Sequence, residues 1–334
     1  MTFEANGKLI SFCEYTEKDF DSYRDCYNRF YKGRYPHTEY LEKSSLHTIL
    51  KSGNLLLTLG KLENGTVVSV SAAKRLTGAL DGIVLMFMRC VSTDFQSKHV
   101  GTNHEKYLLE RIKYHFPNTP ALQADAVTFD IKSQRTLLQN NFKLCGFCFM
   151  MYDSATVLPE LTSRYGTRMS FAIYCNPQKT DDVIIYPPEE HKTAIVDIYK
   201  TLGIKCIIQN AIHVNDNTEY EIIRYDEHKT AELFIKTPGN SRADEMLSVL
   251  NELIKNGYTI SGEINMSHQG CTGIYRKLKE IGFYFSGIRP LSKNGQYLVV
   301  SQTQNAQCGF ETVLLPDEQK KLLQYIINGE KNNE

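Results

Sequence analysis

The sequence contains no tryptophan, no long apolar run and no excess of charge of either sign. Its 38 lysines and arginines balance 38 aspartates and glutamates, so it lacks the basic excess that nucleic-acid-binding proteins usually carry. The longest apolar run, Ile83 to Met88, is far shorter than the ~20 residues that cross a bilayer. These deficits argue against nucleic-acid and membrane partners.

The N-terminus lacks an export signal, because Met1 to Glu4 is not a basic region followed by an apolar segment. We therefore expect a cytoplasmic protein whose nine cysteines are free thiols. Cys145-Gly-Phe-Cys148 is a C-x-x-C, but it lies in an apolar, strand-like segment, whereas redox pairs open a helix. We interpret it as two core cysteines. No second C-x-x-C completes a zinc site, and we expect no metal.

The length of 334 residues favours about two domains. The first half reads as mixed α/β. Thr16 and Asp19 form a capping pattern that opens a helix, and Pro36 breaks it. The continuous apolar segment 83–91 predicts a central strand covered on both faces. We predict strands at 9–15, 55–62, 66–74, 83–91, 121–129 and 142–152. We predict four helices: one that begins at about residue 17, one at 42–51, one that begins after Thr102 and ends at Phe116, and one at 133–141.

The second half repeats this order of elements without repeating residue identities, which indicates a duplicated fold. Ser241 to Asp244 predicts a capping box. The predicted elements lie at 169–175, 190–202, 206–209, 219–225, 231–236, 241–255, 259–265, 274–281, 283–288, 296–302 and 316–328. We expect domains at 1–155 and 169–315, a linker at 156–168, and a C-terminal helix and polar tail at 316–334.

The segment most informative about chemistry is strand, loop and amphipathic helix at 83–116. A helix N-terminus has unpaired N–H groups and partial positive charge, and a loop curled over it converges amides on an anion such as a pyrophosphate. Gly101 would let a ligand approach the backbone, and Lys98 could add a charge. Neither a Walker loop nor G-x-G-x-x-G is present. On these residues alone, an ordinary strand-to-helix turn is the competing interpretation.

Val91-Ser-Thr-Asp-Phe-Gln96-Ser-Lys-His-Val-Gly101 resembles motif A of the GCN5-related N-acetyltransferases (GNAT), a strand followed by [QR]-x-x-G-x-[GA] and a helix. His99 replaces the middle glycine. A downstream region resembles motif B of the family, which is a strand, a short helix, Gly-Phe and a last strand. The matching segments are Ala126–Asp130, Ser133-Gln134, Asn141-Phe142 and Cys145-Gly-Phe147, and Asn141 stands where glycine is usual. Tyr35-Pro36 and Ser133-Gln134 also resemble a bacterial branch with tandem domains. The resemblance covers nearly all of residues 8–152. In residues 169–302 it is limited to the order of the elements and to Gly282-Phe283.

The resemblance implies two GNAT-like α/β domains, each a mixed, mostly antiparallel sheet flanked by helices, the second degenerate. It also implies acetyl-CoA as co-substrate between two splayed central strands. The backbone of Cys90, Val91 and Ser92 would pair with the pantetheine arm. Ser133 or Gln134 would lie near the far end of the cofactor. The pyrophosphate would be held by amides of Gln96, Ser97, Lys98, His99, Val100, Gly101 and Thr102.

In the family the acetyl group passes directly to a deprotonated amine, which requires a base. Asp125 and Asp130 are the base candidates, although a role for Asp130 at the start of the next helix is slightly favoured. The family's usual tyrosine acid is replaced by Leu137, which leaves Tyr152 and Tyr107 as substitutes.

Three further side chains near these motifs have a simpler interpretation. His104 and Glu105 are expected to face solvent, and Cys90 is expected to be a core thiol rather than a nucleophile.

The segment Thr237 to Arg242 shows no second cofactor loop, because Pro238 removes a donor. We therefore expect one active site, in the first half, with the second half walling the acceptor cleft or mediating a homodimer. The expected activity is N-acetyl transfer to a small-molecule or peptide amine. The alternatives are a non-catalytic acyl-CoA-sensing or protein-interaction module, and transfer of a longer acyl group or to a hydroxyl.

Overall fold

The computed structural model describes residues 1–35, 37–153, 168–210, 217–303 and 310–331. Pro36 and nearly all of the predicted linker therefore lie outside the described residues. The first half comprises β1 (Thr2–Ala5), β2 (Lys8–Glu14), α1 (Phe20–Tyr31), α2 (Lys43–Lys51), β3 (Leu55–Leu62), β4 (Val67–Arg75), β5 (Val84–Val91), α3 (Val100–His115), β6 (Ala121–Val127), α4 (Lys132–Gln139), β7 (Lys143–Asp153) and β8 (Arg168–Pro177).

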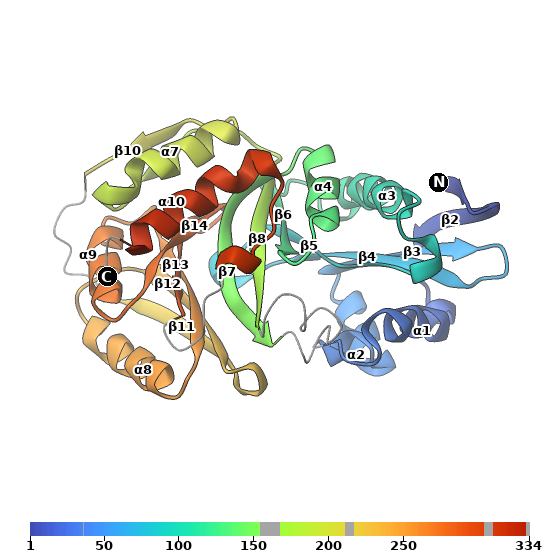
Figure 1. The fold of residues 1–334 in the computed structure, drawn as a ribbon, viewed down its shortest axis with the longest axis horizontal. Coiled ribbons are helices and arrows are strands. Elements are labelled where there is room, and N and C mark those ends of the chain that lie inside the picture. Colours follow the sequence, from blue (N-terminus) through green and yellow to red (C-terminus); the bar gives the residue numbers. More distant parts are fainter. Residues whose placement is uncertain (36, 154–167, 211–216, 304–309, 332–334) are drawn as a thin grey trace.

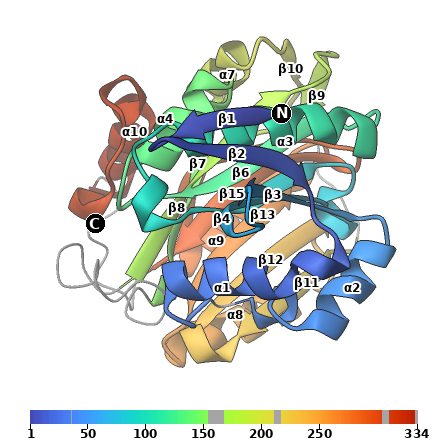
Figure 2. The same cartoon turned by 90° about the vertical axis from the view of Figure 1, so that its right-hand side faces the viewer.

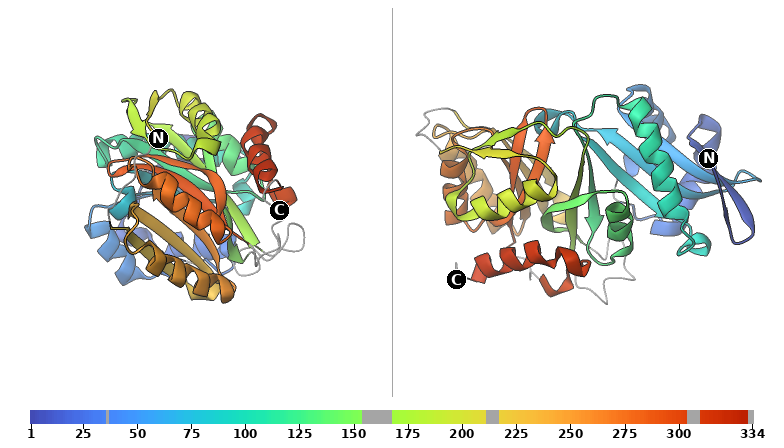
Figure 3. Two further views of the ribbon diagram at one scale, coloured as in Figure 1. Left: turned by 90° about the vertical axis from the view of Figure 1, so that its left-hand side faces the viewer. Right: turned by 90° about the horizontal axis from the view of Figure 1, so that it is seen from above.

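The described residues of the second half form a further five strands of the main sheet, a small strand pair and four helices. They are β9 (Val183–Ile185), α7 (Lys192–Thr201), β10 (Cys206–Ile208), β11 (Glu219–Tyr225), β12 (Thr230–Thr237), α8 (Ala243–Lys255), β13 (Thr259–Asn265), α9 (Cys271–Glu280), β14 (Tyr284–Ser292), β15 (Gly295–Gln302) and α10 (Lys320–Lys331). Figure 3 shows α10 along the outside of this half, near α7 and β14.

Thirteen strands form one sheet in the order β1-β2-β3-β4-β5-β6-β8-β7-β14-β15-β13-β12-β11. Within it, β5 with β6 and β12 with β13 are the parallel neighbours, and the other described pairs are antiparallel. In the first half, α3 and α4 cover one face of the sheet and α1 and α2 the other (Figures 1 and 2). The α/β class and the mostly antiparallel mixed sheet are confirmed.

The two halves share one topology. The order β4-β5-β6-β8-β7 corresponds to β11-β12-β13-β15-β14. A helix links each parallel pair, α3 in one half and α8 in the other, and a second helix follows, α4 or α9. A right-handed crossover is the usual way to connect parallel neighbours. The predicted echo in element order is therefore also a repeat of strand order over five strands of each half, whereas β1 to β3 have no counterpart in the described part of the second half.

The strand β8 was expected to open the second domain, but it lies between β6 and β7 of the first half. Residues 121–127 pair with β8 on one side, and residues 143–153 pair with it on the other. The halves meet where Gly146 of β7 lies opposite Gly287 of β14. One hydrophobic core runs through this junction, from Val84 and Leu108 to Leu250 and Val300.

Most local predictions agree with the structure. Each predicted element has a counterpart, whereas the short strands β1 and β9 were not predicted. At the start of α1, the Thr16 backbone N–H and hydroxyl both donate to the Asp19 carboxylate, at 2.9 and 2.7 Å. Cys145 and Cys148 are buried on β7, as expected for core cysteines.

Two local predictions are wrong. The capping box Ser241–Asp244 is absent, because Arg242 precedes α8 in the left-handed conformation and no side chain caps the helix. In addition, β5 is not covered equally on both faces. Its side chains alternate between buried and half-buried, because one face borders a cavity.

Candidate functional site

The parallel strands β5 and β6 diverge. They pair only from Val84 to Met86, against Leu122 to Ala124. Beyond that point β5 stays paired with β4 and β6 stays paired with β8. A bulge at this position, where Met88 has a φ of 55°, bends β5 further. The edge of β5 from residue 87 to 91 therefore offers main-chain groups to an extended ligand rather than to β6.

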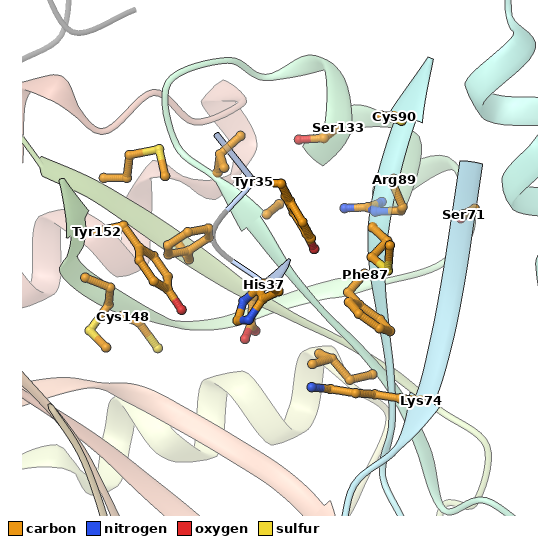
Figure 4. Close-up of a pocket in the computed structure, with 18 of the residues that line it drawn as sticks. Tyr35, His37, Ser71, Lys74, Phe87, Arg89, Cys90, Ser133, Cys148 and Tyr152 are labelled. Atoms are coloured by element: carbon orange, nitrogen blue, oxygen red, sulfur yellow. The ribbon is translucent and has the colours of Figure 1, made fainter. Parts of the chain in front are cut away.

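A cavity of about 950 Å³ occupies this divergence and continues to the second half. Its walls come from both halves: α3, α4 and the strands β4 to β8 on one side, and β11 to β14 on the other. Figure 4 shows Arg89, Phe87 and Lys74 entering it from one side and Tyr35, His37 and Tyr152 from another. Residues of the second half therefore line the same cavity as residues of the first.

At one end the cavity reaches the loop before α3. Ser97 and His99 both have a φ of 59°, which curls the loop over the helix N-terminus, where the first N–H groups have no partner within the helix. The Gln96 side-chain amide donates to the Val91 carbonyl (3.1 Å) and ties the loop to the end of β5. His99, which stands where motif A has its middle glycine, adopts the left-handed conformation that glycine reaches without strain.

Nine of the twelve predicted cofactor-binding residues line the cavity. They are Cys90, Val91, Gln96, Ser97, His99, Val100, Gly101, Thr102 and Ser133. The Ser133 hydroxyl is buried without a hydrogen-bond partner. A β-carbon at Gly101 would meet only a Val91 methyl group, at 3.5 Å, so the fold itself does not require glycine there.

Ser92, Lys98 and Gln134 do not line the cavity. Gln134 is fully buried, and its amide donates to the carbonyls of Val127 (3.1 Å), Asp130 (3.2 Å) and Leu314 (2.9 Å). Its side chain therefore holds the start of α4 to neighbouring segments. This structural role differs from the predicted contact with a cofactor.

The prediction that His104 and Glu105 face solvent is wrong, since they are only 2% and 3% exposed. The Thr58 hydroxyl donates to the Ser71 carbonyl (2.8 Å), so it accepts from His104 Nε2 (3.0 Å). His104 Nδ1 then accepts from the Ser69 hydroxyl (2.8 Å). Burial lowers the pKa of His104 to about 3, which keeps this neutral tautomer.

Two other predicted side chains near β5 have structural partners. Glu105 accepts from Arg89 (2.9 Å) and from Asn140 (3.1 Å). Cys90 is buried, and a hydrogen bond with the Cys26 thiol together with burial raises its pKa well above the usual value. The interpretation of Cys90 as a core thiol is confirmed.

The base and acid candidates have mixed surroundings. Asp125 lines the cavity and accepts two hydrogen bonds from Arg289, at 3.1 and 3.2 Å. Asp130 also lines the cavity and accepts from the Lys132 N–H at the start of α4. The hydroxyl of Tyr152 points into the cavity (Figure 4), and burial raises its pKa. Tyr107 does not line the cavity.

A set of charged residues that no sequence motif had indicated lies at the end of the cavity nearest the second half. Lys74, Glu232, Glu263 and Arg289 lie there beside Asp125. Arg289 also donates to Glu263 (2.7 Å). A charged side chain inside an otherwise apolar strand is rare unless it is paired. Glu263 and Arg289 both lie in such segments, and this pattern could have indicated them from the sequence. Among the described residues, no group of His, Cys, Asp and Glu is arranged to hold a metal ion.

The corresponding region of the second half is closed. The parallel pair β12 and β13 stays in register over six residues, from Thr230 to Ile235, so the strands do not diverge. Before α8, Ser241 is bridged to Asn217, and its carbonyl accepts from the Thr218 N–H (2.8 Å). The repeated topology therefore carries an open cleft in the first half and a packed ladder in the second.

The chain is similar to acetyltransferases of the GNAT fold. An N-acetyltransferase from Staphylococcus aureus Mu50 matches with 13% identity and a TM-score of 0.41, over 51% of this chain and 99% of that one. A GNAT superfamily phosphinothricin acetyltransferase from Sinorhizobium meliloti, in complex with AcCoA, matches with 14% identity and a TM-score of 0.40, over 50% and 88%. Ribosomal-protein-S5-alanine acetyltransferase from Vibrio fischeri matches with 10% identity and a TM-score of 0.40, over 54% and 97%.

These structural matches, over about half of the chain, agree with the family resemblance of the sequence. No protein-family model matches the sequence, and no curated protein matches it. No helix in the described part of the chain is long and apolar enough to span a membrane.

Proposed function

We propose that the chain is an acetyl-CoA-dependent N-acetyltransferase with one active site, in the cleft of the first half. The observation that carries this proposal is a continuous cavity that joins the open edge of β5 to the N-terminus of α3. An extended amide chain ending in a pyrophosphate needs main-chain partners along a strand and a cluster of N–H groups at one end.

The residues present fit this co-substrate. Main-chain N–H groups from Ser97 to Thr102 would hold the pyrophosphate, and the β5 edge would pair with the pantetheine arm. The orphaned Ser133 hydroxyl supplies a further partner, and the absence of a side chain at Gly101 leaves room for the phosphates. Bound there, the co-substrate supplies an activated acetyl thioester, which an amine can attack directly.

A non-catalytic acyl-CoA-sensing or protein-interaction module is the second candidate. The observation that favours it is that both predicted bases, Asp125 and Asp130, are engaged in hydrogen bonds within the fold. Consumption of acetyl-CoA that depends on an added amine would support the N-acetyltransferase. Tight CoA binding without such turnover decides for the module.

The placement of the cofactor is tested by Gly101→Glu. A carboxylate in the phosphate cradle should abolish CoA binding through steric conflict and like charge, measured by isothermal titration calorimetry. Gly273→Glu is the matched control, because it also lies in a helix and a β-carbon there meets nothing within 4 Å. Unchanged affinity of Gly101→Glu, with both variants folded, would show that the cradle is elsewhere.

A further inference from the structure

The end of the cavity farthest from the α3 loop is an ionic cluster built by both halves. Asp125 on β6 and Lys74 on β4 come from the first half. Glu232 on β12, Glu263 on β13 and Arg289 on β14 come from the second half. Three carboxyl groups therefore share the site with two basic side chains. This balance favours a positively charged ligand.

The hydrogen bonds in this cluster leave carboxylate oxygens without a donor. The Arg289 guanidinium donates to Asp125 (3.1 and 3.2 Å), to one oxygen of Glu263 (2.7 Å) and to the side-chain oxygen of Gln123 (3.1 Å). The other oxygen of Glu263 is buried and has no partner. Glu232 accepts one long hydrogen bond, from the Tyr225 hydroxyl (3.5 Å). A buried carboxylate oxygen without a donor, as in Glu263, is costly, and Glu232 is half-buried with a single long hydrogen bond. The cluster is therefore suited to an incoming N–H group.

The walls beside this cluster are aromatic. Tyr31 and Tyr35, from α1 and the segment after it, are in ring contact at 4.9 Å. His37 lies 6.4 Å from Tyr152, measured between ring centroids. All four line the cavity together with Phe87, and Figure 4 shows Tyr35, His37, Phe87 and Tyr152 around one space. Such walls favour a flat apolar group, which can stack on the rings.

We propose that this end of the cavity is a subsite for a primary amine carried on an aromatic or other flat apolar group, with Glu232 of the second half accepting the amine's proton and Glu263 accepting a hydrogen bond from it. This inference rests on the proposed acetyl transfer. It makes the second half part of the catalytic centre. Asp125 and Arg289 then act as positioning residues, because Arg289 orients Glu263.

The ammonium group of the acceptor gives one proton to the Glu232 carboxylate, and the neutral nitrogen forms a bond to the thioester carbonyl carbon. The C–S bond breaks with its electron pair on sulfur, and the second proton from nitrogen goes to the thiolate. The products are the acetamide and CoA thiol, and Glu232 returns its proton to solvent.

The surroundings of Glu232 suit a base near neutral pH. Burial, followed by the nearby charge of Glu263, raises its pKa to about 7, which is close to the optimum for proton transfer at physiological pH. The titratable and charged groups that act on it from the neighbouring strands are Lys74, Asp125, Tyr152, Tyr225, Glu263 and Arg289.

The test is Glu232→Gln, which keeps the shape of the side chain but cannot take a proton. The probe is 2-phenylethylamine with acetyl-CoA, followed by release of CoA thiol from pH 5.5 to 9, with spermidine as a non-aromatic amine for comparison. We expect unchanged CoA affinity, a fall in kcat/KM of about 100-fold or more, and loss of the acidic limb of the pH profile near 7. Glu227→Gln is the matched control, because it makes the same chemical change at an exposed glutamate in the turn between β11 and β12. This variant should behave as wild type.

A second variant keeps the proposal testable if Glu232→Gln does not fold. Glu232→Asp retains the carboxylate but withdraws it by one methylene, so it should lower kcat by about 10- to 100-fold while retaining the acidic limb.

The outcomes separate the two proposals. Absence of CoA binding by the wild-type protein contradicts the proposed function. CoA binding with a wild-type rate and pH profile in Glu232→Gln overturns the role of Glu232. Preference for spermidine over 2-phenylethylamine overturns the substrate class. So does the combined result that the CoA-loaded protein binds neither amine in calorimetric titrations and that neither amine causes release of CoA thiol from acetyl-CoA.

Discussion

Single residues near the site carry structure and chemistry at once. His99 occupies the left-handed region, with a φ of 59° and a ψ of 10°, which costs a residue with a β-carbon roughly 1–2 kcal/mol. Burial keeps His104, in the following turn, neutral, and its hydrogen bonds with Thr58 and Ser69 fix the tautomer. Protonation at Nδ1 would leave the Ser69 hydroxyl without its acceptor. A histidine that must stay uncharged therefore links α3 to the strands β3 and β4 beneath it.

The depressed pKa of His104 predicts acid sensitivity. In the folded protein its pKa is about 3, below the unfolded value near 6.5, so only the unfolded state takes up this proton between those values. Stability is fully present above pH 6.5 and falls on acidification, by up to about 1.4 kcal/mol per pH unit from this residue. Urea unfolding from pH 7.5 to 5 measures the slope.

His104→Gln should flatten that slope, whereas His115→Gln, at the exposed end of α3, should leave it as in the wild type. An unaltered slope in His104→Gln would mean that other groups cause the acid sensitivity.

At the scale of elements, the divergence of β5 and β6 decides what the first half can do. The same topology occurs twice, but β12 and β13 remain paired over six residues whereas β5 and β6 pair over three. A ladder that is satisfied on both sides of a strand has no main-chain groups left for a ligand. A difference in strand pairing, more than a difference in fold, separates the open half from the closed one.

This difference predicts an asymmetric response in amide hydrogen exchange. Addition of CoA should slow exchange in residues 87–91 on β5 and in 97–102 before and within α3, because the ligand would pair with these groups. Exchange in residues 230–235 of β12 should stay slow with or without CoA. Mass spectrometry of peptic fragments measures both segments in one experiment. Protection confined to β12 would place the ligand in the other half.

At the scale of the whole molecule, the cavity depends on how the two halves join. Gly146 and Gly287 face each other across β7 and β14. A β-carbon at Gly146 would lie 2.8 Å from the Ser286 carbonyl oxygen and 2.9 Å from the Gly287 α-carbon. Both neighbours are backbone and cannot rotate away. The close approach of two glycines is therefore one of the contacts that join the half carrying Glu232, Glu263 and Arg289 to the first-half cleft.

Gly146→Ala should accordingly destabilise the protein by about 1–3 kcal/mol or more through overpacking. The matched control is Gly273→Ala, which has open space for a β-carbon and should be neutral or stabilising by up to about 1 kcal/mol. Chemical denaturation gives both values. If Gly146→Ala is as stable as the control, the strands can separate at no cost and the junction is looser than the contacts indicate.

The sequence by itself determined the local elements, the capping of α1 and the loop before α3. Each of these depends on side chains a few residues apart, through hydrophobic periodicity, turn chemistry and helix capping. It also carried the family resemblance, because motif A is a continuous segment from Val91 to Gly101.

Only the tertiary structure decided the burial of His104 and Glu105, the insertion of β8 between β6 and β7, and the ionic cluster around Arg289. Asp125 and Arg289 are 164 positions apart in the chain, and no local pattern links them. Strand order and the junction of the two halves are set by which apolar faces pack together over long sequence separations. The charged end of the cavity exists only once that packing is complete.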